Sequence, residues 1–204
     1  MLSRQSLWVP VAAHSPAFLE HYITFTQRSP HTNLMLKALK YAPENTRVLL
    51  QPDSRNKGRN VTLAMAFPFT ITSAACEACG AGPAATRAMG SGAFTSLVDT
   101  ASSLHLMERL LPSDVVHVSV NIQANCLKPI SEGERVVLIS RMDKAGKRLN
   151  FLSAELLRDD SSGSAPGALV DEKEASSVKE LERLLRQYTV LGNGKHVKCV
   201  IQSN

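Results

Sequence analysis

The chain has few cysteines, and only two of them lie close together in the sequence, which argues against a metal site or a disulfide scaffold. Among its 204 residues are four cysteines, and Cys76 and Cys79 have the C-x-x-C spacing that zinc sites use. A structural zinc ion needs four ligands, and no second pair follows, since Cys126 and Cys199 stand alone. We therefore expect reduced, structural thiols and no metal.

Several catalytic and nucleotide-binding signatures are also missing. No Walker loop, G-x-S-x-G elbow or H-E-x-x-H helix is present. Gly80, Gly82 and Ala85 follow a dinucleotide-binding spacing, but that fingerprint needs an acid at the end of a strand, and Asp99 lies within a helical pattern. We expect no cofactor that resides in the protein.

The chain lacks a long hydrophobic run and has fewer acidic than basic residues. Its longest apolar stretch, residues 61–71, contains Pro68 and is shorter than the roughly 20 residues of a membrane-spanning helix. We therefore expect no membrane span. Lys and Arg outnumber Asp and Glu by 23 to 18, giving a net charge of +5. This charge suits an anionic partner, such as a membrane surface or nucleic acid, or is simply a solvated basic surface.

What the sequence does have is a helix of small residues with one charge. At about 100° per residue, Asp99 shares a face with small and hydroxyl residues, while apolar residues fall on the opposite face. The first set is Gly92, Thr95, Ser96, Ser102 and Ser103, and the second is Phe94, Leu97, Ala101 and Leu104. Asp99 is the only charged residue between Gly90 and Leu104. A lone carboxylate on an uncharged face indicates a half-buried site, or else a structural acid capped by Ser and Thr.

Alternating residues after this helix predict an antiparallel sheet. Val116, Val118, Val120 and Ile122 alternate with polar residues, which predicts a strand that buries the apolar set. Strands over 135–142 and 148–157 flank a turn at 144–147, where we expect Gly146 to take a positive φ. A helix over 31–41 and strands over 46–51 and 61–70 are expected earlier in the chain.

Four motifs in this order resemble the hotdog-fold acyl-coenzyme A thioesterases of the phenylacetate-pathway and thioesterase-superfamily-member-2 type. They are Gly90–Thr100, Val118–Asn121, Leu127–Ile130 with Gly133, and Asn193–Lys198. The resemblance covers roughly residues 31–204, with an insertion. It implies an α+β hotdog fold, in which a curved antiparallel sheet wraps one long helix. It also implies chains paired as dimers, or pairs of dimers, with each active site across the dimer interface.

The resemblance also implies a site for acyl-coenzyme A, with coenzyme A as part of the substrate. By position, Asp99 matches the family's catalytic acid, as general base or nucleophile, and Ser119 matches the hydroxyl that holds the attacking water. Backbone N–H groups at a helix N-terminus stabilise an oxyanion, so Ser91 or Gly92 would supply that donor. The basic residues Lys147, Arg148, Lys195 and Lys198 would meet the nucleotide phosphates.

The sequence departs from the family pattern at the start of this helix. Relatives typically have His-Gly-Gly there and an Asn about six residues earlier, whereas this chain has Gly90-Ser91-Gly92 and Ala84. Two usual polar contributors are therefore absent. The preceding segment, 72–89, is rich in Ala and Gly and longer than in relatives. The fold is thus better supported than catalysis, and three functions stay open: a thioesterase, a catalytically degenerate scaffold or assembly factor, and a hotdog module that binds acyl groups without hydrolysis.

Two segments lie outside the family pattern. Residues 1–19 contain Arg4, His14 and several serines but no acid, which is typical of a mitochondrial presequence, although Pro10 and Pro16 equally suit an arm that packs on the domain. Residues 1–30 thus form an N-terminal extension. An insertion at about 160–188 follows a flexible loop and predicts a helix over 172–188 with an apolar stripe. Either segment could bind a protein partner, in a mitochondrial complex that could include RNA.

Overall fold

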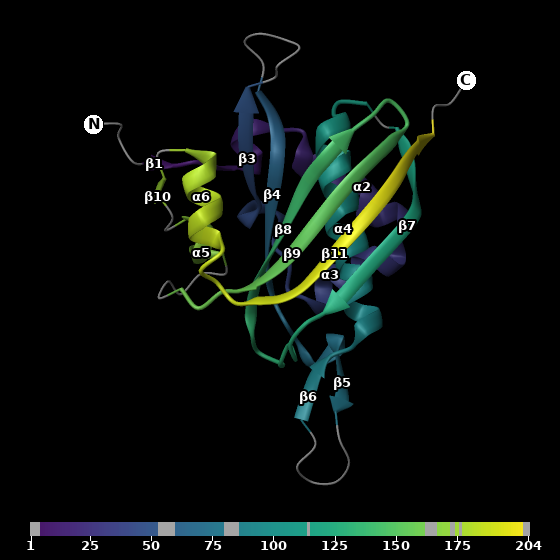
Figure 1. Ribbon diagram of the computed structural model, residues 1–204. Coiled ribbons are helices and arrows are strands. Elements are labelled where there is room, and N and C mark those ends of the chain that lie inside the picture. Colours follow the sequence, from purple (N-terminus) through teal and green to yellow (C-terminus); the bar gives the residue numbers. More distant parts are fainter. Residues whose placement is uncertain are drawn as a thin grey trace.

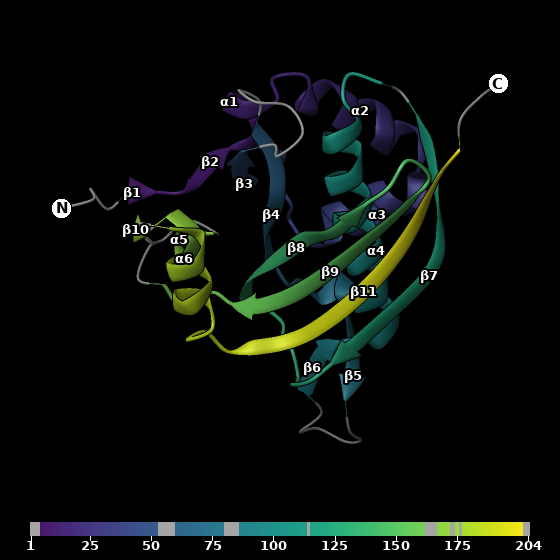
Figure 2. The same ribbon diagram turned by 45° about the horizontal axis from the view of Figure 1, so that its top comes forward.

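One long helix, α4 (Ser91–Leu110), packs against a sheet of seven antiparallel strands (Figure 1). The computed structural model describes residues 5–52, 60–79, 86–113, 115–161, 167–171, 174, 175 and 177–201. In spatial order the strands are β2 (Trp8–Pro10), β3 (Arg47–Pro52), β4 (Asn60–Thr70), β8 (Arg135–Ala145), β9 (Leu149–Arg158), β11 (Val190–Ile201) and β7 (Val116–Cys126). β7 is therefore an edge strand, as Figure 2 shows.

The apolar face of α4 is buried against the sheet, as its periodicity predicts. Phe94, Leu97, Ala101 and Leu104 all lie in the main core. The last strand approaches this helix closely because it carries glycine: a Cβ on Gly192 would lie 2.6 Å from the Phe94 ring. The central helix can therefore sit deep in the curve of the sheet.

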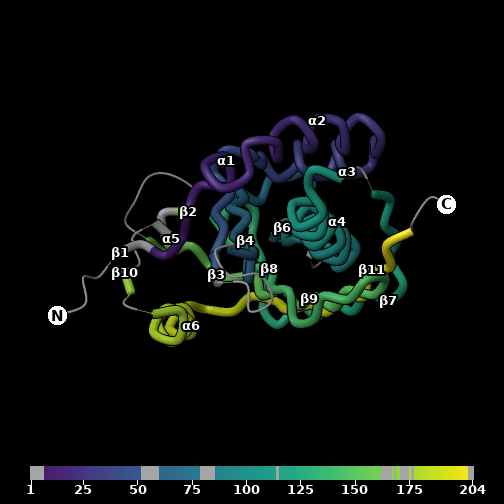
Figure 3. Tube along the Cα trace, turned by 90° about the horizontal axis from the view of Figure 1, so that it is seen from above, coloured from purple at the N-terminus to yellow at the C-terminus, as the bar shows by residue number. Residues whose placement is uncertain are grey.

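The N-terminal segment packs as part of this domain. Within it, β2 pairs with β3, and α1 (Val11–His14) and α2 (Phe18–Arg28) follow. Trp8, Val11 and Phe18 are buried, so the described part of the segment contributes to the core. Figure 3 shows α2 and α3 (Pro30–Ala38) on the side of α4 that the sheet leaves open. A short 3₁₀ turn, η1 (Pro43–Asn45), then leads into β3.

The insertion packs on the outer face of the sheet, opposite α4. It contains α5 (Ala168–Asp171), the short strand β10 (Glu174–Ala175), which pairs with β1 (Gln5–Ser6), and α6 (Val178–Leu185). Leu181 and Leu185 join a second core with Val137 and Ile139 of β8. The helix expected over 172–188 is thus shorter, because the Ser177 side chain accepts a hydrogen bond from the Glu180 N–H and caps the helix there.

The faces of β7 differ from the prediction. Val116 and Val120 are 62% and 59% exposed, whereas His117 and Ser119 point to the helix side of the sheet. The register against β11 shifts between Val197 and Lys198, and beyond this bulge Ile122 packs against the main core. A bulge reverses which alternate residues face inward, which a strict period of two cannot reveal.

The turn between β8 and β9 forms where expected, but Gly146 does not have the positive φ that was expected of it. The described glycines with positive φ are Gly133 and Gly167, and Gly146 is not among them. A Cβ on Gly146 would lie 2.6 Å from the Leu149 carbonyl oxygen, so close backbone approach requires glycine there.

The segment before α4 contains structure in place of a plain loop. A 3₁₀ turn, η2 (Ser73–Ala75), precedes a hairpin of β5 (Cys76–Cys79) and β6 (Thr86–Met89). Residues 80–85, which include Gly80, Gly82 and Ala84, lie outside the described residues. Cys76 is buried in this hairpin, and the side chain of Cys79 lies outside the part that the structure describes. The described ranges contain no group of three side chains that could hold a metal ion.

Within the described ranges, no helix combines the length and the apolar composition that a bilayer crossing requires.

Candidate functional site

Asp99 projects from the middle of α4 toward the last strand and the edge strand. Its Oδ1 atom accepts a hydrogen bond from the Ser119 hydroxyl on β7 at 3.0 Å and one from the Lys198 ammonium on β11 at 3.1 Å. The side chain is 47% exposed. Among the described residues, none donates a hydrogen bond to Oδ2. One carboxylate oxygen is thus anchored and the other is available.

Lys198 is the principal partner of Asp99, which the sequence did not predict. It was expected to face nucleotide phosphates, but its side chain is only 2% exposed and its Nζ lies 3.2 Å from the Ser119 hydroxyl. This correction has a physical reason: His196, Lys198 and Val200 alternate along β11 and all point toward α4. A buried ammonium requires an opposite charge nearby, and Asp99 supplies it.

The electrostatics of this pair keep the carboxyl ionised. Burial alone would raise the pKa of Asp99, but the Lys198 charge, the hydrogen bonds from Lys198 and Ser119, and the nearby His196 together lower that pKa below its ordinary value. Burial lowers the pKa of Lys198, against the opposing effect of Asp99. At neutral pH, Asp99 is therefore a carboxylate.

Two neutral histidines flank the pair. His196 lies on β11 with its Nε2 atom 3.5 Å from Asp99 Oδ1, and its Nδ1 atom is 2.6 Å from the Ser102 hydroxyl. His117 lies on β7, two residues before Ser119. Burial, followed by the Lys198 charge, lowers the pKa of each imidazole to about 4, with Asp99 opposing. Both rings are therefore uncharged at pH 7, so Lys198 is the cation beside Asp99.

The predicted oxyanion donors lie at the start of α4, away from Asp99. Gly90 is the N-cap, and both Ser91 and Gly92 are exposed in the first turn. Seven residues separate Gly92 from Asp99, which is about 10 Å along a helix at 1.5 Å per residue. One small reacting group therefore cannot contact both the Gly92 N–H and a water held by Asp99 of the same chain.

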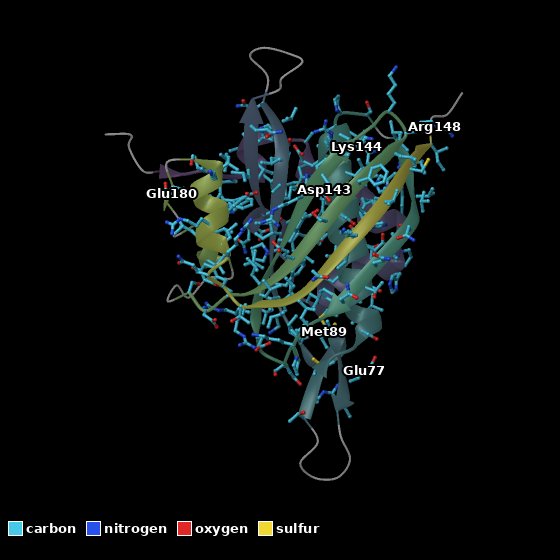
Figure 4. All side chains as sticks on the ribbon, viewed as in Figure 1. Glu77, Met89, Asp143, Lys144, Arg148 and Glu180 are labelled. Atoms are coloured by element: carbon cyan, nitrogen blue, oxygen red, sulfur yellow. The ribbon has the colours of Figure 1, made fainter. Side chains whose placement is uncertain are left out.

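The other predicted cations are exposed and lie at two places. Lys147 and Arg148 lie in the turn that joins β8 and β9, and the Val200 N–H donates to the Arg148 carbonyl, which places this turn beside the end of β11 (Figure 4). Lys195 points from β11 to the outer face of the sheet, where it lines a groove with Arg141 and Arg186. The structure thus brings together Asp99, Ser119 and Lys198, and leaves the remaining predicted residues apart from them.

Sequence reasoning missed both histidines and the true place of Lys198. A signal was present, because His196 and Lys198 alternate in a strand that must cross α4. Nothing in the sequence states that β7 and β11 are neighbours, and that pairing is what brings His117 to the same cluster.

Comparison with known protein families gives one match for part of the chain. Residues 91–165 match the family model of the thioesterase superfamily. No curated protein matches the sequence.

Solved structures share the architecture along nearly the whole chain. The PaaI protein of Escherichia coli has a TM-score of 0.54 at 11% identity, covering 93% of this chain and 97% of its own. Thioesterase superfamily member 2 from zebrafish gives 0.52 at 13% identity with 95% and 99% covered, and the mouse protein gives 0.51 at 14% with 91% and 96% covered. The expected α+β hotdog fold and the resemblance to these thioesterases are confirmed; identities this low carry the fold and leave activity open.

Proposed function

We propose that this chain, which has the hotdog fold and matches the thioesterase superfamily over residues 91–165, hydrolyses acyl-coenzyme A thioesters. The observation that carries the proposal is the asymmetry of Asp99. Oδ1 is fixed by Ser119 and Lys198, while Oδ2 is free of described donors on a half-exposed side chain. A general base needs this combination of fixed orientation and an available oxygen.

In the proposed reaction, Asp99 Oδ2 takes a proton from a water molecule as the water oxygen bonds to the thioester carbonyl carbon. The carbonyl oxygen becomes an oxyanion. When that intermediate collapses, the carbon–sulfur bond breaks, the departing sulfur takes the proton back from Asp99 so that coenzyme A leaves as a thiol, and the carboxylic acid is released with the Asp99 carboxylate restored. In this proposal the Ser119 hydroxyl, which holds Asp99 Oδ1, also accepts a hydrogen bond from the water and so orients it. Attack by Oδ2 itself, followed by hydrolysis of the resulting anhydride, uses the same geometry.

The oxyanion requires a second copy of the chain. The Ser91 and Gly92 N–H groups lie about two helical turns from Asp99, so a second chain would bring its own helix N-terminus to the carbonyl. β7 provides the surface for pairing, because it is an eleven-residue strand at the edge of the sheet. Two antiparallel β7 strands would form a twofold dimer.

Lys198 compensates for polar groups that the start of α4 lacks. Its ammonium stabilises the Asp99 carboxylate at 3.1 Å and adds positive charge beside the forming oxyanion. The exposed Lys147, Arg148 and Lys195 remain candidates for the coenzyme A phosphates, and no other cofactor is proposed.

The test is release of thiol from short, medium, long and aromatic acyl-coenzyme A esters. Asp99→Asn keeps the size of the side chain and removes the base, so we expect turnover to fall by about 10² to 10⁴. Glu108→Gln removes the other acid of the same helix and should leave turnover within about twofold. Equal loss in both variants, or an unaffected Asp99→Asn enzyme, would overturn the proposal.

A second candidate is a hotdog subunit that binds acyl groups, or acts as a scaffold, without hydrolysis. The buried Lys198 favours it, because an ion-paired carboxylate is a weaker base than a free one. Tight binding of acyl-coenzyme A with no thiol release, by a folded dimer, would support the acyl-binding form.

A mitochondrial location is proposed from the composition of residues 1–19 alone. Because Trp8, Val11 and Phe18 are buried in the domain, any processing compatible with this fold would cut before Trp8. Mass spectrometry of the N-terminus of the native protein, together with its distribution between cell fractions, tests this proposal.

A further inference from the structure

A small cavity lies beside the Asp99 cluster, between the N-terminal helix and the central helix. It has a volume of about 170 Å³ and is bounded by α2, the C-terminal half of α4 and the start of β7. Figure 3 shows α2 next to α4. Its apolar walls include Phe25, Met107, Leu110 and Val115.

The cavity adjoins the site, with His117 between the two. This imidazole lines the cavity and packs against Phe25 with ring centroids 6.4 Å apart. It shares a strand face with Ser119, two residues and about 7 Å further along β7. Ser119 in turn donates to Asp99. The cavity thus begins at His117, about 7 Å along β7 from Ser119, the residue that donates to Asp99.

His117 also carries an unused hydrogen-bonding atom. Its Nδ1 atom is buried and has no hydrogen-bond partner among the described residues. A buried polar atom without a partner costs free energy. The apolar walls are joined by polar side chains from His21, Thr24, Arg28 and Ser113, so the cavity fits a small ligand that has an apolar body and a polar end.

We propose that this cavity receives the acyl group of the thioester, and that Phe25 on α2 sets its maximum length. The proposal rests on the proposed function for the identity of the ligand as a thioester. A cavity of about 150 Å³ accommodates benzene, so the preferred acyl group has no more than about six non-hydrogen atoms beyond the carbonyl. This assigns the N-terminal extension a role in substrate selection.

The first arm of the test compares kcat/KM over straight-chain acyl-coenzyme A esters of two to twelve carbons and benzoyl-coenzyme A. We expect the wild-type values to drop beyond about seven carbons. Phe25→Ala should raise the value for decanoyl-coenzyme A about tenfold relative to butyryl-coenzyme A. Ile23→Ala, at an exposed position of the same helix, is the matched control and should leave the profile unchanged.

The second arm does not depend on turnover. A non-hydrolysable thioether analogue of butyryl-coenzyme A is titrated while the His117 imidazole resonances are followed by NMR, with coenzyme A alone as the control. A shift seen with the analogue and absent with coenzyme A supports the cavity as the acyl site, even if no thioester is hydrolysed. Hydrolysis with an unchanged chain-length profile in Phe25→Ala would overturn the cavity proposal and leave the proposed function intact.

A variant that fills the cavity guards against misfolding of Phe25→Ala. Thr24 lines the same cavity, and its hydroxyl makes only a local hydrogen bond to the Glu20 carbonyl. Thr24→Leu should therefore shorten the accepted chain, and should weaken binding of the butyryl analogue at least about tenfold. Unchanged binding and an unchanged profile in a folded Thr24→Leu protein would overturn the proposal.

Discussion

Two acids on the same helix have opposite surroundings. Glu108 is 3% exposed and accepts a hydrogen bond from the Ser15 hydroxyl at 2.7 Å, with His14 Nε2 at 3.5 Å. Asp99, nine residues earlier, is 47% exposed and is held by Ser119 and Lys198. The N-terminal segment covers Glu108, whereas the Asp99 side chain remains about half exposed and no described residue donates a hydrogen bond to its Oδ2 atom.

The difference shows how the fold distinguishes a buried structural acid, Glu108, from an acid in the candidate site, Asp99. The partners of Glu108 come from a segment that packs over it, so its polar environment is closed within one chain. The partners of Asp99 come from β7 and β11, at the open edge of the sheet. An acid whose surroundings end at a free strand edge is the one that a second chain can complete.

The largest expected effect tests whether the Asp99 site needs a second copy. Asp99→Asn and Gly92→Leu should each abolish turnover, the second because its side chain covers the helix N-terminus. A Cβ at Gly92 meets no atom within 4 Å, so this variant should fold. In an equal mixture, half of the dimers are hybrids with one intact site, so turnover should recover to about a quarter of wild type.

The measurement is thiol release after the two purified variants are mixed under conditions that allow chain exchange, with each variant alone as the control. Each single variant should also be a dimer by light scattering. A mixture that stays as inactive as its components would place Asp99 and its oxyanion donor in one chain, or separate the site from the dimer altogether.

The next effect concerns Glu108 and is one of stability. Glu108→Gln weakens the hydrogen bond from Ser15 in a closed environment, and we expect the free energy of unfolding to fall by about 1 to 3 kcal/mol. Ser15→Ala, which removes the same bond from the other side, should cost about 1 kcal/mol. Urea denaturation measures both. Full stability of the Glu108→Gln protein would show that the contrast between the two acids is not energetic.

Much of the fold could be predicted from local pattern. The apolar stripe of α4 and the strands expected over 135–142 and 148–157 follow from spacing and turn residues, and the structure has these strands at Arg135–Ala145 and Leu149–Arg158. The last strand was expected from the family resemblance alone. The inward face of β7 could not, because a single bulge near Val120 exchanges its faces, and a bulge depends on the partner strand. The start of α6 was readable from Ser177 and Glu180, which form a capping pattern that periodicity alone overlooks.

Only part of the site could be predicted from the sequence, because the rest depends on how the strands pack against α4. Asp99 and Ser119 lie in motifs of neighbouring elements, and the structure joins them by a hydrogen bond. The place of Lys198 depends on which face of β11 meets α4 and on how deep that face lies. Basic residues are usually exposed, so composition favours the surface, and tertiary packing reverses that expectation here.

The smallest expected effect separates the roles of charge and position at Asp99. Replacing Lys198 by Met removes the cation and keeps an apolar side chain of similar length. Burial then raises the pKa of Asp99 without the opposing ammonium, so the acidic limb of the pH dependence of kcat/KM should move to higher pH. Lys198→Arg retains a positive charge and should keep the limb near its wild-type position.

Because this shift is read from the pH profile and not from the maximum rate, a general loss of packing would not imitate it. An acidic limb that stays in place in Lys198→Met would mean that Ser119 and His196 suffice to keep Asp99 ionised, and the contrast with Glu108 would then rest on exposure alone.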